Sequence, residues 1–106
     1  MATPPLKYLS QNKFPYSQNL HKFFQQNNFA KVFIHGRLYH FGIIQAKVIE
    51  QLYAASLTNS PWVCGKELLY QAGSKSIALR ELFKSQTNWQ QLIESDRKGS
   101  YRLRLL

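Results

Sequence analysis

A sharp break between two short amphipathic patterns constrains the fold more than any other feature of this sequence. The first pattern covers residues 65–72 and places Leu68 and Leu69 on one face. Gly73 follows where glycine commonly ends a helix, and Ser74 stands where serine commonly begins one. A second helix is therefore expected over about residues 75–85, with its apolar stripe buried. Two helices joined by so short a turn form a helix-turn-helix.

Strand patterns flank these helices. A hairpin is expected over residues 31–41, turning at Gly36, and a longer helix over residues 42–55. A brief extended segment at 62–64 precedes the helix-turn-helix, a short turn follows at 89–91, and a hairpin turning at residues 96–100 ends the chain.

Residues 1–30 differ from the rest because Pro, Gln and Asn are interleaved with aromatic residues, and a short helix over 17–26 is one option there. The 106 residues suffice for one small core. The predicted organisation is an N-terminal aromatic, Gln/Asn-rich arm over 1–30 and one domain over 31–106.

The charge is strongly positive and unevenly distributed. The formal net charge is +9, and residues 1–49 carry six bases and no acid. Such an excess favours a polyanionic partner, most often nucleic acid. The hydrophobic fraction of 44% is too high for a disordered basic tail. Apolar runs are shorter than the roughly 20 residues that cross a bilayer, and no export signal is visible. A cytoplasmic protein without membrane contact is expected.

No group of residues points to catalysis. The single Cys64 excludes an internal disulfide and a multi-cysteine zinc site, and we expect its thiol to be buried. The histidines lack metal-ligand spacing, carboxylates are few, and there is no phosphate-binding glycine loop. The sequence therefore predicts a protein that is not an enzyme and uses no metal or cofactor. The aromatic residues expected in the core are Phe33, Phe41, Phe83, Trp89 and Tyr101.

In order, the expected elements are hairpin, helix, short strand, helix, tight turn, helix and hairpin, with Gly99-Ser100-Tyr101-Arg102-Leu103 near the end. Residues 31–105 resemble the winged-helix output domain of bacterial response regulators, whose wing closes with a Gly-Tyr-Arg-Leu-like segment. The resemblance implies an α+β winged helix-turn-helix: a three-helix core, a small N-terminal hairpin and a C-terminal β-hairpin wing. It also implies that the third helix enters a DNA major groove and that the wing contacts the DNA backbone or minor groove.

Basic residues fall where such contacts require them. The outward face of the third helix can contact phosphates and base edges, and Arg80 on it can form a bidentate contact with guanine. The basic tip of the last hairpin turn can contact the DNA backbone. The same residues also fit a solvated helix face, and the arginines of the last strand fit a protected sheet edge. The predicted DNA-binding residues are Lys75, Ser76, Arg80, Lys84, Arg97, Lys98 and Arg102.

These features predict a DNA-binding transcriptional regulator, nucleoid-associated if bacterial, whose partner is double-stranded DNA and whose basic arm adds phosphate contacts. The alternative is a winged-helix protein-interaction module that docks an acidic protein; structured RNA is a third, weaker option. The arm residues Phe14, Tyr16, Phe23 and Phe24 either cover the domain or pair two copies into a homodimer.

Overall fold

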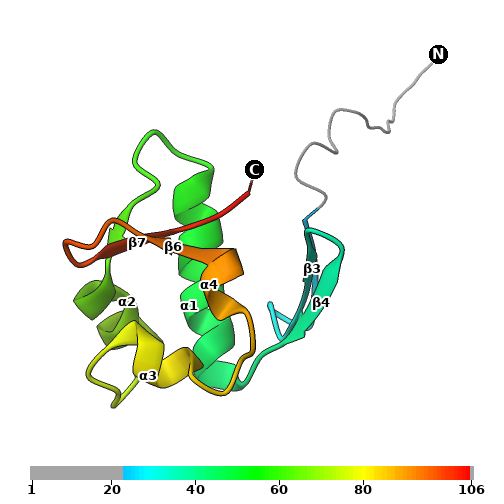
Figure 1. The fold of residues 1–106 in the computed structure, drawn as a ribbon, viewed down its shortest axis with the longest axis horizontal. Helices are drawn as coiled ribbons and strands as arrows, with labels where there is room; N and C mark the ends of the chain where they lie inside the picture. The colour runs from blue at the N-terminus through cyan, green and yellow to red at the C-terminus, as the bar shows by residue number, and fades with distance from the viewer. Residues whose placement is uncertain (1–22, 106) are drawn as a thin grey trace.

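The structure is a computed structural model, and it describes residues 23–105. A long helix, α1 (Ile43–Ser56), runs through its centre. An N-terminal sheet lies on the right of α1 in Figure 1, and the later helices and the second sheet lie at its centre and left. Strands and helices thus combine in an α+β architecture, as the sequence predicts.

The N-terminal sheet is antiparallel, with strand order β2-β3-β4. Its strands are β2 (Phe24–Gln26), β3 (Lys31–Ile34) and β4 (Arg37–His40), and the last two form the expected hairpin. Val32, Ile34 and Tyr39 point inward and are almost fully buried. Residues 24–26 form a strand and not the end of a helix over 17–26; residues 17–22 lie outside the described residues.

The β3–β4 turn is anchored to the far end of the chain. His35 and Gly36 both have positive φ, as the tight primed hairpin turns require. The Nε2 atom of His35 donates a hydrogen bond to the carbonyl oxygen of Arg104. The N-terminal sheet is therefore tied to the segment that follows the last strand.

Helix α1 begins one residue later than expected and ends at Ser56. The Gln45 side-chain oxygen accepts a hydrogen bond from the Gly42 amide at 3.0 Å, which satisfies one donor at the helix start. Its buried face holds Ala46, Val48, Ile49 and Leu52. The Nε2 atom of Gln51 donates to the carbonyl of Leu68 at 3.0 Å, so a polar contact adds to the apolar packing against the next helix.

The first half of the helix-turn-helix agrees with the prediction. Strand β5 (Val63–Cys64) leads directly into α2 (Gly65–Ala72), which buries Leu68 and Leu69. Gly73 adopts φ 75°, and the Ser74 amide donates back to the Leu69 carbonyl at 2.9 Å. This left-handed residue ends the helix and turns the chain.

The second half corrects the prediction. Helix α3 covers only Leu79–Phe83, not residues 75–85. The Ser74 hydroxyl accepts the Ser76 amide at 3.0 Å, which folds a local turn instead of starting a helix. Ala78 is then extended, with φ −140° and ψ 155°. Residues 75–78 therefore form a connection ahead of α3.

The C-terminal part contains α4 (Trp89–Leu92), β6 (Ile93–Ser95) and β7 (Ser100–Leu103). The last strand, β7, is central, because the sheet order is β5-β7-β6. The expected final hairpin is thus present, and it pairs with the strand that precedes α2.

The core lies between α1 and the two sheets. Phe83 is fully buried, with its ring 5.9 Å from that of Phe41 and 6.0 Å from that of Trp89, centroid to centroid. Two burial predictions are wrong: Phe33 is 39% exposed, and the Cys64 thiol is exposed. Within residues 23–105, no helix has the length and apolar character needed to cross a membrane.

Candidate nucleic-acid interface

The turn between β6 and β7, hereafter the wing turn (residues 96–99), is fixed against the start of α2. The Gly65 amide donates to the Gly99 carbonyl at 2.8 Å. Gly65 is buried, and a side chain there would meet the Tyr101 ring. Figure 1 shows α2, α3 and the wing turn toward the left, away from the N-terminal sheet. Helices α2 and α3 and the wing turn thus share one end of the molecule.

Asp96 holds the wing turn in shape. Its Oδ1 atom accepts the amides of Lys98 at 2.7 Å and Ser100 at 2.9 Å. These backbone hydrogen bonds, with Ser100 contributing most, lower the pKa of the Asp96 carboxyl below its ordinary value. Arg97 has φ 62°, so the tip is a tight turn carrying two exposed basic side chains.

The predicted residues around α3 fall into two groups. Lys75 and Arg80 are exposed, and the structure gives neither an ion-pair partner among residues 23–105. Lys84 follows α3 and pairs with Glu81 at 3.0 Å, with both side chains mostly in solvent. Ser76 is half-buried in the connection. A solvent-exposed pair of this kind contributes little energy, so Lys84 remains available to another anion.

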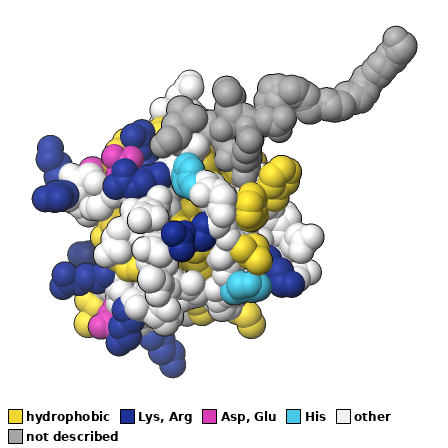
Figure 2. Space-filling model, turned by 45° about the vertical axis from the view of Figure 1, so that its right-hand side comes forward, with side chains coloured by type: hydrophobic (Ala, Val, Ile, Leu, Met, Phe, Trp, Pro, Cys, Tyr) yellow, Lys and Arg dark blue, Asp and Glu magenta, His cyan; other side chains and the backbone are white. Residues whose placement is uncertain are grey.

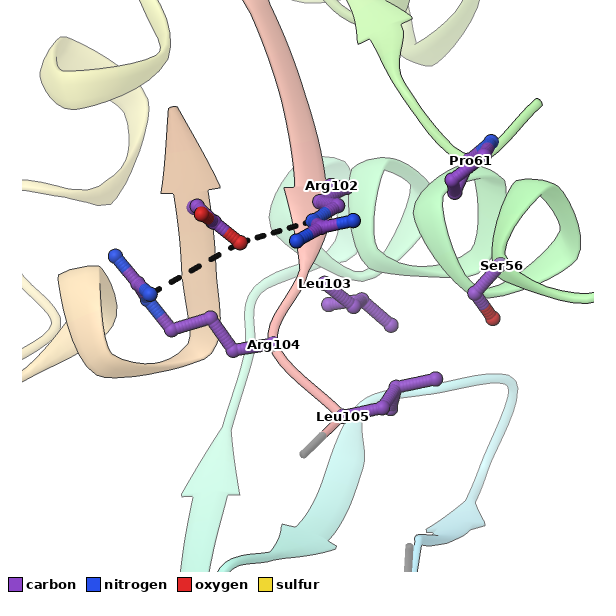
Figure 3. A pocket seen from close by; sticks show the side chains of 7 residues that line it. Ser56, Pro61, Arg102, Leu103, Arg104 and Leu105 are labelled. Carbon is purple, nitrogen blue, oxygen red and sulfur yellow. Dashed lines mark hydrogen bonds and ion pairs between the residues drawn. The ribbon is translucent and has the colours of Figure 1, made fainter. Parts of the chain in front are cut away.

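Arg102 is already engaged within the protein. Its Nε atom lies 2.9 Å from a Glu94 carboxylate oxygen, and its guanidinium lies 4.6 Å from the Trp62 ring centroid. Arg104 approaches the same oxygen at 3.9 Å. Figure 3 shows both arginines beside a cavity of about 250 Å³, which Ser56 and Pro61 also line. One carboxylate partly neutralises two guanidinium groups, which sets Arg102 apart from the other predicted residues.

Two further residues of this end were not singled out from the sequence. Lys66 is exposed directly after Gly65, whose amide bonds to the wing turn. Ile77 is 90% exposed in the α2–α3 connection. Ile77 does not share the helical spacing of the buried Leu79 and Phe83, and this mismatch could have marked it as exposed. The expectation of a helix over residues 75–85 hid the mismatch.

The net charge of this end is positive, because residues 65–84 and 96–99 hold six Lys and Arg against the three acids Glu67, Glu81 and Asp96. Residues 23–105 contain eleven Lys and Arg against all five Asp and Glu of the chain. Within that range, the ion-paired bases are Lys84, Arg102 and Arg104. Also within it, no cluster of three or more His, Cys, Asp or Glu is placed to hold a metal ion.

Compared with known proteins, the chain matches no family model, no curated protein and no solved structure.

Proposed function

We propose that this protein is a winged-helix DNA-binding protein that acts as a transcriptional regulator on double-stranded DNA in the cytoplasm. The observation that carries the proposal is a group of basic residues at one end of the molecule that have no ion-pair partner among the described residues. Lys75 and Arg80 belong to the helix-turn-helix there, and Arg97 and Lys98 to the wing turn. The Gly65–Gly99 hydrogen bond joins the two parts.

In this arrangement α3 and the connection before it approach the major groove. Arg80 supplies the base contact, because a guanidinium matches the two acceptors of guanine. Lys75 and Lys84 contact phosphates on either side of it, and Arg97 and Lys98 contact the backbone beside the groove. Arg102 contributes less, since Glu94 and Trp62 already engage its guanidinium.

The test measures binding to a labelled random duplex and to a duplex selected for tight binding. With the four phosphates that contact Lys75, Lys84, Arg97 and Lys98 neutralised, the logarithm of affinity falls against the logarithm of salt with a slope of about −4. Arg80→Ala lowers the preference for the selected site, whereas Lys98→Ala weakens both duplexes by the same factor. Lys31→Ala, an exposed lysine of the N-terminal sheet, is the matched control and leaves duplex binding unchanged.

Two results would overturn the proposal. One is an absence of duplex binding at low micromolar protein near physiological salt. The other is a loss caused by Lys31→Ala as large as the loss caused by Lys98→Ala, which would mean that charge anywhere on the surface serves equally well.

A second candidate function, docking of an acidic protein, is favoured by the apolar side chains at the same end. Ile77 is 90% and Tyr70 is 78% exposed, and Lys75 lies two residues before Ile77. Mixed apolar and basic surfaces suit protein partners. Ile77→Ser separates the two functions, because it would abolish such docking and leave phosphate contacts intact.

A further inference from the structure

The N-terminal sheet has an outer face that the core does not use. Cross-strand pairing aligns Phe24 on β2 with Phe33 on β3, and Phe33 with Leu38 on β4. These side chains are 61%, 39% and 52% exposed. The adjacent row on the same face consists of Gln26, Lys31 and His40. We call these six residues the outer sheet face.

The two exposed rings are available for stacking. The centroids of Phe24 and Phe33 are 6.4 Å apart, with 39° between the ring planes. The preceding residue, Phe23, behaves differently: its ring stacks on Tyr53 at 4.5 Å with an angle of 13°. Of these two consecutive residues, Phe23 therefore packs against the core, and Phe24 remains in solvent beside Phe33.

The charge around these rings has one sign. The first acidic residue of the chain is Glu50, so no carboxylate side chain belongs to the sheet. Lys31 and His40 are exposed on the outer sheet face, whereas Arg37 pairs with Ile34 and lies on the opposite face. Figure 2 brings this side forward: yellow side chains gather on its right with blue and cyan ones, while the magenta ones lie on its left. Pairing two copies through this face would bring like charges together, which disfavours a homodimer there.

We propose that the outer sheet face binds single-stranded nucleic acid. Two adjacent bases stack on Phe24 and Phe33, Leu38 contacts the edge of a base, and Lys31 neutralises a phosphate. Aromatic rings beside a lysine, with no carboxylate on the sheet, suit a polyanion whose repeating units carry flat apolar faces. Stacking accepts every base, so little sequence preference is expected.

This site goes beyond the proposed function, because it lies on a different element and takes a different form of nucleic acid. A protein that holds duplex at one end and a single strand at the other suits junctions where a duplex opens. The two activities are separable by mutation, since no residue is shared between the outer sheet face and the wing turn or α3.

The test uses a fluorescein-labelled oligo-dT of about 15 nucleotides and measures anisotropy. Phe24→Leu and Phe33→Leu keep an apolar side chain and remove the ring, and both positions are exposed, so the fold is preserved. We expect the double variant to bind the oligonucleotide at least about fivefold more weakly than the parent protein. Lys31→Ala should reduce the salt slope by about 0.7.

Matched measurements keep the two proposals apart. The double Phe→Leu variant should bind random duplex as the parent does, and Arg80→Ala should bind oligo-dT as the parent does. A parent protein that does not bind oligo-dT overturns the inference, whatever its duplex affinity. Equal binding of oligo-dT by the double variant and the parent also overturns it. So does a sedimentation experiment in which the parent protein is a dimer and the Phe→Leu variants are monomers.

A last outcome concerns a protein ligand. If oligo-dT does not bind, and an acidic peptide with apolar side chains binds the parent and the Phe→Leu variants equally but not a Phe24→Ser, Phe33→Ser variant, then apolar docking replaces base stacking as the role of this face.

Discussion

Replacing Gly65 with alanine tests the contact that fixes the wing turn against α2. An added Cβ atom at Gly65 would lie 2.8 Å from Cε1 and 3.3 Å from Cδ1 of Tyr101, and 3.4 Å from the Gly99 carbonyl oxygen. Ordinary contact begins near 3.4 Å, so the Tyr101 ring must move by about 0.6 Å. That ring belongs to β7, the central strand of its sheet.

The magnitude follows from two opposing terms. Overpacking of this kind costs about 1–3 kcal/mol. Alanine gains up to about 1 kcal/mol over glycine in a helix interior, and less at the first position. We therefore expect Gly65→Ala to lower the free energy of unfolding by about 1–2 kcal/mol. Urea denaturation, followed by far-ultraviolet circular dichroism, measures this loss for a small cooperative domain.

A double-mutant cycle with Tyr101→Leu isolates the clash. The leucine side chain ends before the Cε1 position, so Gly65→Ala should cost nothing or stabilise slightly in that background. The coupling free energy should then be at least about 1 kcal/mol. An equal cost of Gly65→Ala in both backgrounds would refute the assignment of this contact.

Three further changes probe other parts of the fold. Phe83→Ala removes a fully buried ring and should cost about 3–5 kcal/mol in urea denaturation; a loss below 1 kcal/mol would contradict its central place. Gly73→Ala forces a side chain into φ 75° and should cost about 1–2 kcal/mol by thermal unfolding, with Gly73→Asn closer to wild type. Asp96 has a lowered pKa when folded, so its contribution is full above the unfolded value of about 3.8 and is lost as pH falls through the folded value. Asp96→Asn should therefore destabilise at pH 6 and flatten the acid decline of the melting temperature; an unchanged acid limb would argue against these hydrogen bonds.

Local signals predicted much of the fold. Gly73 ends α2 because glycine adopts positive φ at little cost, and the residue type alone predicts this. The start of α3 was missed because Ser74 has two local uses, capping a helix or closing a turn on Ser76. Propensity does not choose between them. The packing of Leu79 and Phe83 into the core favours the shorter helix.

Alternation in β3 indicated which residues share a face, but not which face meets the core. Val32 and Ile34 pack inward, so Phe33 faces solvent, opposite to the expectation. The ion pair of Arg102 could not be predicted from the sequence either, because its pairing with Glu94 depends on the register across the wing turn. Both outcomes depend on contacts between segments distant along the chain.

The strand order β5-β7-β6 affects how the chain folds as it is synthesised. Strands β2, β3 and β4 pair in the order in which they are made, so the hydrogen bonds between them form without any downstream strand. Strands β5 and β6 do not pair with each other, and both wait for β7, which is made after them. The sheet of β5, β6 and β7 therefore closes only after residues 100–103 have been made, and until then α1 lacks its packing against β7.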